Sequence, residues 1–97
     1  MPYRLSQQAE QDLVDIFLYG AQHFGVAAAR RYHQQFSRTF EFLAAHPKAA
    51  PLRQEINPPV HIHPIGQHLV IYQQLPDQSI LLIRIRHSHE DWLNQEF

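Results

Sequence analysis

The fold is decided by Ile80-Leu-Leu-Ile-Arg-Ile-Arg-His87, an apolar run that two arginines interrupt near its end. Side chains alternate between the two faces of a β-strand, so the run predicts a strand with two unlike faces. The alternation sets Leu81, Ile83 and Ile85 against Leu82, Arg84 and Arg86, followed by His87. Two arginines on one face are costly to cover unless they are paired or reach solvent. We therefore expect that face to be a groove, a partner surface or an active site rather than the main core.

Two further strands are expected before this one. Residues 60–64 alternate, residues 65–67 form a turn, and residues 68–74 form the next strand. A second turn at residues 75–78 leads into the final strand. Loops this short join antiparallel neighbours, so the three strands predict an antiparallel meander.

Two helices are expected upstream of the meander. Ser6 is a good N-cap for an amphipathic helix that runs to about residue 22. Gly25 suits the break after it, and a longer helix then continues to His46-Pro47, because proline cannot extend the hydrogen-bond ladder. The apolar stripes of the two helices are Ala9, Leu13, Ile16, Phe17 and Gly20, and Ala29, Tyr32 or His33, Phe36, Phe40 and Leu43.

These elements define an α+β fold in the order β-α-α-β-β-β. A short strand at Tyr3–Leu5 opens the chain, and a proline-rich connector occupies residues 47–59. We predict a helical hairpin packed on one face of an antiparallel sheet, followed by a short C-terminal helix. Trp92 is expected to pack that helix on the domain, or else to anchor a partner. With 97 residues, the chain is expected to form one domain, 1–97.

Composition excludes some classes of protein and disfavours others. The chain has no cysteine, so it can form neither disulfides nor thiolate metal sites. Its formal net charge of −1 argues against tight binding to nucleic acid. No apolar run approaches the roughly 20 residues of a membrane span, and the first residues lack a signal-peptide layout. We therefore expect a cytoplasmic protein without membrane contact.

Histidines and arginines supply the candidate chemistry. His61 and His63 point to one face of a predicted strand, where zinc would need further ligands. We expect hydrogen-bonded or solvent-facing histidines instead, with no metal and no cofactor. Arg84, Arg86 and His87, with His61 or His63, could supply the base, acid and cation of a phosphodiester-cleaving site. We favour the other hypothesis, in which they bind an acidic segment of a partner, because the chain is not basic.

Charged residues on the two helices are expected to be solvated rather than functional. This applies to Arg30, Arg31 and Arg38 on the second helix, and to Glu10, Asp12 and Asp15 on the first.

Several segments carry a family resemblance through their order and spacing. They are Pro2-Tyr-Arg-Leu-Ser6 with Ala9 and Asp12-Leu13; Tyr19, Phe24-Gly-Val26 and Tyr32; Leu43-Ala-Ala-His-Pro47; Pro64-Ile-Gly-Gln-His-Leu-Val-Ile-Tyr72; and Ile83-Arg-Ile-Arg-His87 with Asp91. Together they cover nearly the whole chain, which resembles the ParE toxins of the RelE/ParE superfamily. These are the toxin halves of bacterial type II toxin–antitoxin pairs.

The resemblance implies a partner and an activity. The partner would be a ParD-like antitoxin whose C-terminal segment wraps the toxin and the surface of its first helix. Its expected contacts are Leu82, Arg84, Arg86 and Trp92. The activity would be inhibition of DNA gyrase through a stabilised gyrase–DNA cleavage complex, without catalysis by the toxin itself. DNA would be reached only indirectly, through the antitoxin complex.

Two other functions stay open at this point. One is a RelE-like, ribosome-dependent mRNA endoribonuclease that uses His61, His63, Arg84 and His87. Lys48 is the only lysine, so the chain has no lysine-rich loop of the kind such enzymes use. The other is a protein that has lost toxicity and represses transcription together with its antitoxin.

Overall fold

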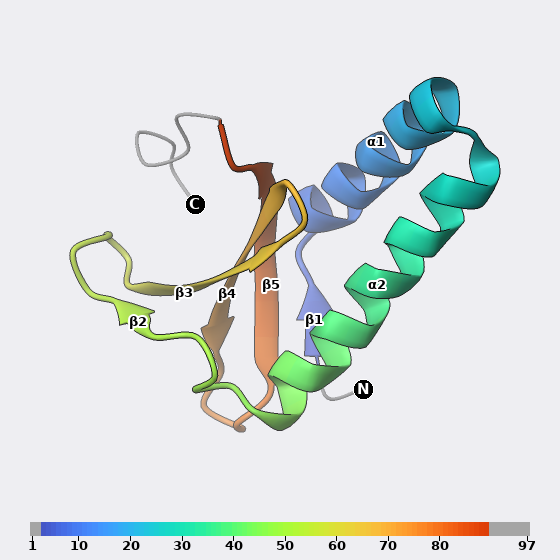
Figure 1. The fold of residues 1–97 in the computed structure, drawn as a ribbon. Helices are drawn as coiled ribbons and strands as arrows, with labels where there is room; N and C mark the ends of the chain where they lie inside the picture. Colours follow the sequence, from blue (N-terminus) through green and yellow to red (C-terminus); the bar gives the residue numbers. More distant parts are fainter. Residues whose placement is uncertain (1–2, 90–97) are drawn as a thin grey trace.

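In the computed structural model, which describes residues 3–89, two antiparallel helices lie on one face of a five-stranded sheet (Figure 1). The elements are β1 (Tyr3–Leu5), α1 (Gln7–Phe24), α2 (Val26–Ala45), β2 (Leu52–Arg53), β3 (Val60–Ile65), β4 (His68–Gln74) and β5 (Ile80–His87). The predicted α+β class and the helical hairpin on one face are confirmed. The predicted C-terminal helix and Trp92 lie outside the described residues.

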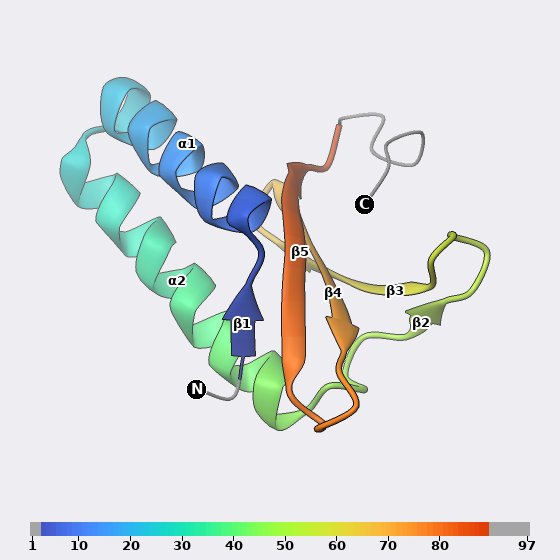
Figure 2. The ribbon, with the colours of Figure 1, turned by 180° about the vertical axis from the view of Figure 1, so that it is seen from behind.

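The sheet is mixed, and the prediction of an antiparallel sheet is wrong at one edge. Its strand order is β1-β5-β4-β3-β2, and β1 runs parallel to β5, with Tyr3 opposite Ile80 (Figure 2). The connection from β1 to β5 runs through the helical hairpin and the three strands between them, which is long enough for parallel neighbours. The other pairs are antiparallel. Strand β2 was not predicted, because two residues inside a proline-rich connector are too few to show a period.

Both helices form where the sequence predicts them. The hydroxyl of Ser6 accepts a hydrogen bond from the Ala9 backbone N–H at 3.0 Å, which confirms the predicted N-cap. Helix α1 ends before Gly25, whose φ of 93° and ψ of 156° suit glycine. Burial of Ala29, Phe36, Phe40 and Leu43 confirms the stripe of α2. The tip of the hairpin projects beyond the sheet (Figure 1).

A β-bulge in β5 changes which side chains face the helices. Tyr72 lies opposite Leu82 and Ile71 lies opposite Arg84, so Ile83 is an extra residue on β5. Leu82 and Ile85 consequently both enter the core beneath the helices, although a regular strand would place them on opposite faces. The predicted grouping of Ile85 with Leu81 and Ile83, and of Leu82 with the arginines, is therefore wrong.

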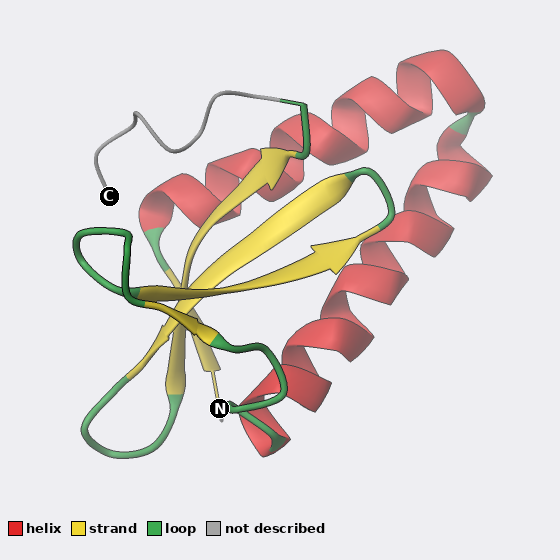
Figure 3. Ribbon diagram, turned by 60° about the vertical axis from the view of Figure 1, so that its left-hand side comes forward, coloured by secondary structure: helices red, strands yellow, loops and turns green. Residues whose placement is uncertain are grey.

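The helix-free face has a smaller apolar cluster of its own. Its buried members are Ile56, Val60, Ile71 and Ile83, flanked by the half-buried Ile62, Leu69 and Leu81. Ile56 comes from the connector before β3, which curls beside β2 and β3 away from the helices (Figure 3). Arg86 lies on this face opposite Leu69. The sheet thus separates a main core under the helices from a second apolar layer that borders the arginines.

The β3–β4 turn is tied to α2. Gly66 has a φ of 55°, and the hydroxyl of Tyr32 lies 3.1 Å from the Ile65 carbonyl oxygen and 2.7 Å from Nδ1 of His68. A Cβ atom on Gly66 would lie 2.7 Å from that hydroxyl oxygen. Glycine is needed here both for its backbone conformation and because Tyr32 occupies the space that a side chain would take.

Replacement of this glycine should destabilise the protein. We expect Gly66→Ala to lower the free energy of unfolding by about 2 kcal/mol, because it adds backbone strain and displaces the Tyr32 hydroxyl. Gly20→Ala is the matched control, since a Cβ there would make an ordinary 3.5 Å contact with Ala29 inside a helix. It should be neutral or stabilise by up to about 1 kcal/mol. Urea unfolding measures both, and equal effects of the two changes would contradict the assignment.

Candidate functional site

The free edge of β5 is closed by the start of α1. Beyond Leu5, where β1 ends, the Ser6 backbone N–H donates to the Leu82 carbonyl oxygen at 2.9 Å. The Ser6 hydroxyl donates to the Ile83 carbonyl oxygen at 2.6 Å. Six residues further along the chain, on α1, the Asp12 carboxylate accepts from the Ile85 N–H at 2.9 Å. Polar groups of the helix therefore replace the neighbouring strand where the bulge interrupts the regular pattern.

Asp12 also forms a bidentate ion pair with Arg84. Nε of Arg84 donates to one carboxylate oxygen at 2.9 Å, and a terminal guanidinium nitrogen donates to the other at 3.0 Å. The side chains are only 19% and 13% exposed, for Arg84 and Asp12 respectively. Bidentate geometry with little solvent makes this a strong contact. The prediction of a solvated Asp12 is wrong, because its carboxylate is the acceptor that joins α1 to β5.

The expected antitoxin-binding residues do not form one surface. Leu82 is fully buried under the helices, so it supports β5 and presents nothing to a partner. Arg84 is held by Asp12 and lies opposite Ile71, and the half-buried Arg86 lies opposite Leu69, so both arginines border the apolar cluster of the helix-free face. Trp92 lies outside the described residues. Among the described members of the set, Arg86 therefore lies half-buried on the helix-free face, apart from the ion pair that joins α1 to β5.

The four residues of the endoribonuclease alternative are spread over the sheet. His61 is buried, stacks on Tyr72 at 4.9 Å between ring centroids, and has its Nδ1 atom 2.7 Å from the Ala50 carbonyl oxygen. His61 lies opposite Tyr72, and His87 lies opposite His68, four residues away along β4. That spacing is about 13 Å, too far for a shared proton or phosphate contact. Arg84 is meanwhile engaged by Asp12.

Three histidines lie close together where β4 begins and β5 ends. The His68 and His87 ring centroids are 5.3 Å apart, and those of His87 and His89 are 5.2 Å apart. The Tyr32 hydroxyl lies within hydrogen-bonding distance of His68. Burial raises the pKa of Tyr32 above its ordinary value of 10.0, and a hydrogen bond to the Gln67 backbone lowers that pKa in part. Within residues 3–89, no three side chains of metal-ligand type converge on a point.

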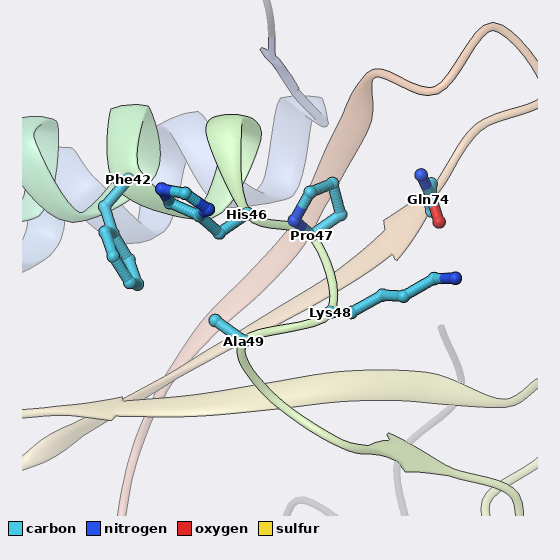
Figure 4. Close-up of a pocket in the computed structure, with 6 residues that line it drawn as sticks. All are labelled: Phe42, His46, Pro47, Lys48, Ala49 and Gln74. Carbon is cyan, nitrogen blue, oxygen red and sulfur yellow. The ribbon is translucent and has the colours of Figure 1, made fainter.

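Two hollows lie on the helix side of the molecule. The larger, which we call the hairpin groove, has a volume of about 640 Å³. Its lining comes from both helices, the β3–β4 turn and the end of β5: Asp15, Ile16, Tyr19, Gly20, Phe24, Ala28, Ala29, Tyr32, Gly66, Gln67, His68 and His87. The smaller, of about 510 Å³, lies where α2 passes into the connector, between Phe42, His46, Pro47, Lys48, Ala49 and Gln74 (Figure 4).

Sequence reasoning missed the hairpin groove. Tyr19 and Phe24 carry part of the family resemblance in the sequence, and in the structure these two residues are 59% and 72% exposed. Val14 and Leu18 of α1 and Val26 at the start of α2 are also exposed. The available signal was the presence of large apolar residues outside the core stripe of α1, which a solvated helix face does not require.

The described elements define a small α+β protein in which two helices pack on a five-stranded mixed sheet. A chain of the solved "Chromosomal ParDE TA system from P. aeruginosa" has the same fold, with a TM-score of 0.75 at 18% identity over 90% of this chain and 95% of that one. Toxin ParE1 of Caulobacter vibrioides is 33% identical over 87 residues, 90% of this chain and 88% of the relative. The model of a family described as "ParE toxin of type II toxin-antitoxin system, parDE" matches residues 3–92. The chain therefore belongs to the ParE toxin family of type II toxin–antitoxin systems.

None of the described helices is long and apolar enough to cross a membrane.

Loss of the Asp12 carboxylate should strongly destabilise the protein. We expect Asp12→Ala to lower the free energy of unfolding by about 3 kcal/mol, because it leaves a mostly buried guanidinium and the Ile85 N–H without their acceptor. Asp15→Ala, on the exposed face of the same helix, should change it by no more than about 0.5 kcal/mol. Denaturant unfolding of both variants, repeated in an Arg84→Met background, gives the coupling energy. Additive effects of Asp12→Ala and Arg84→Met would contradict a direct pair.

Proposed function

We propose that this chain inhibits DNA gyrase and is neutralised by a ParD-like antitoxin. The observation that carries the proposal is the family match over residues 3–92, which includes the helical hairpin and all five strands. The relative from C. vibrioides is named a ParE1 toxin, and the structure from P. aeruginosa is a ParDE system. Both likenesses support a toxin that works together with an antitoxin.

The antitoxin is proposed to reach the helix-free face of the sheet. Arg86 offers a positive charge there, beside the apolar cluster around Ile71 and Ile83. An acidic antitoxin side chain could pair with it through a charge-assisted hydrogen bond. Arg84 would act indirectly, since its ion pair with Asp12 fixes the position of α1 against β5. The burial of His61 and the pairing of Arg84 favour this proposal over mRNA cleavage by the histidine set.

A gyrase assay tests the activity. We expect the antitoxin-free protein to make plasmid DNA accumulate in linear, protein-linked form when gyrase and ATP are present, because the cleaved complex is stabilised. Addition of the antitoxin should reverse the effect. An unchanged supercoiling reaction with folded protein would contradict the proposal, and a cell-free translation assay would then separate mRNA cleavage from loss of toxicity.

A binding measurement tests the arginine contact. We expect Arg86→Ala to weaken the complex with the antitoxin about tenfold, as loss of one charged interface contact does. Arg38→Ala removes an exposed arginine from α2 and should leave the dissociation constant within about twofold. Isothermal titration calorimetry compares the two with the unmodified chain. Equal affinities for the two variants would remove Arg86 from the interface.

A further inference from the structure

We propose that the solvent-facing side of α2 contacts the phosphate backbone of DNA through Arg30, Arg31 and Arg38. The inference rests on the proposed function and deepens it, because a protein that stabilises cleaved gyrase–DNA complexes works beside DNA. It assigns to this chain a direct contact with nucleic acid, in addition to its contacts with protein partners. Such a contact is independent of base sequence, since phosphate groups carry no sequence information.

The low net charge of the chain conceals two helices of opposite charge. Helix α2 carries three arginines and one acidic residue, Glu41. Helix α1 carries three acidic residues and neither lysine nor arginine. The formal net charge of −1 therefore averages over a basic helix and an acidic one. Because the local distribution of charge decides where an anion is attracted, the near-neutral total does not exclude a DNA contact on α2.

The three arginines share the side of α2 that faces solvent. Arg38 follows Arg31 by seven positions and Arg30 by eight, spacings that return to nearly the same side of a helix. All three are exposed, and α2 lies along an outer edge of the molecule in two opposite views (Figure 1, Figure 2). Seven residues correspond to a rise of about 10 Å, so the guanidinium groups can reach separate phosphates.

The charges of these arginines are not neutralised by neighbouring acidic residues. Within residues 3–89, Arg30, Arg31 and Arg38 form no ion pair, whereas Arg53 and Arg84 each pair with a carboxylate. An external anion therefore does not have to displace an acidic side chain of the protein. Arginine suits phosphate especially well, because its planar guanidinium can donate two parallel hydrogen bonds to one phosphate group.

The surroundings of the arginines favour DNA over an acidic protein surface. The exposed residues between Arg31 and Arg38 are His33, Gln34 and Gln35, and none of them is apolar. Protein interfaces are organised around a desolvated apolar core, which this stretch does not offer. Glutamine amides and arginines, in contrast, are common donors to phosphate oxygens.

The contact is weak by itself and gains its effect from gyrase. Three phosphate contacts are fewer than those of a protein that binds DNA tightly, which agrees with the overall charge of the chain. DNA that gyrase already holds would, however, be presented to α2 at a high effective concentration. The arginines would then add to the stability of the cleaved complex without recruiting DNA on their own.

Binding to a short DNA duplex at low salt tests the inference without gyrase. For the antitoxin-free chain, fluorescence anisotropy should give a plot of log affinity against log salt with a slope of about −2.7, because each neutralised phosphate contributes about −0.9. The Arg31→Gln/Arg38→Gln variant should bind about tenfold more weakly, with a slope of about −0.9.

Two further variants serve as controls. Arg4→Gln/Lys48→Gln removes the same charge from two exposed positions outside α2 and should keep the affinity within about twofold and the slope unchanged. Arg31→Lys/Arg38→Lys retains both charges and should keep the affinity within about threefold. Circular dichroism and thermal unfolding verify that each variant is folded. An equal loss of affinity in the two glutamine variants would overturn the assignment to α2.

The gyrase assay then separates this inference from the proposed function. The Arg31→Gln/Arg38→Gln variant should need several-fold more protein than the intact chain to trap the same fraction of linear DNA. An intact chain that binds DNA through α2 but leaves gyrase unaffected refutes the proposed function alone. An intact chain that traps cleaved DNA but does not bind the duplex at low salt overturns the inference alone. If the glutamine variant also loses activity in that case, α2 contacts an acidic surface of gyrase instead of DNA.

Discussion

Closure of the β5 edge by Ser6 and Asp12 is the constraint on which the rest of the structure depends. Strand β1 is only three residues long, so it pairs with β5 no further than Leu82. Without polar groups from α1, the carbonyl of Ile83 and the N–H of Ile85 would lack these partners beside a helix, and unsatisfied buried backbone groups are costly. The same contacts fix the start of α1 and therefore the direction of the whole hairpin.

The bulge at Ile83 and the Asp12–Arg84 ion pair depend on each other structurally. The extra residue brings Ile85 into the main core, and Arg84 can meet a carboxylate from the neighbouring helix. An arginine in a central strand is then stabilised by two hydrogen bonds instead of being exposed to solvent. The result is a short polar seam between two apolar layers, one under the helices and one on the other face of the sheet.

The helices and strands whose apolar residues recur with a clear period could be predicted from the sequence. The cap at Ser6, the α2 stripe and the three C-terminal strands all follow from local pattern and turn chemistry. Strand β2, the parallel pairing of β1 and the bulge in β5 could not, because each depends on contacts between residues far apart in sequence. Asp12 is the clearest example of a residue whose environment the sequence does not reveal. Its position in the helical pattern groups it with solvent-exposed acidic residues, and it is buried only because the edge of β5 lies beside it.

The position of β5 in the sheet sets the order in which the protein can acquire its shape. This strand is the last of the described strands to be synthesised, yet it lies between β1 and β4 and accepts α1 along its edge. Domains tend to fold from the N-terminus during synthesis, but here the first helix has no sheet to rest on until residues 80–87 have been made. Long-range pairing of this kind also slows folding. The main core of the toxin would thus stay unformed until residues 80–87 have been made, because both β1 and α1 depend on them for their contacts with the sheet.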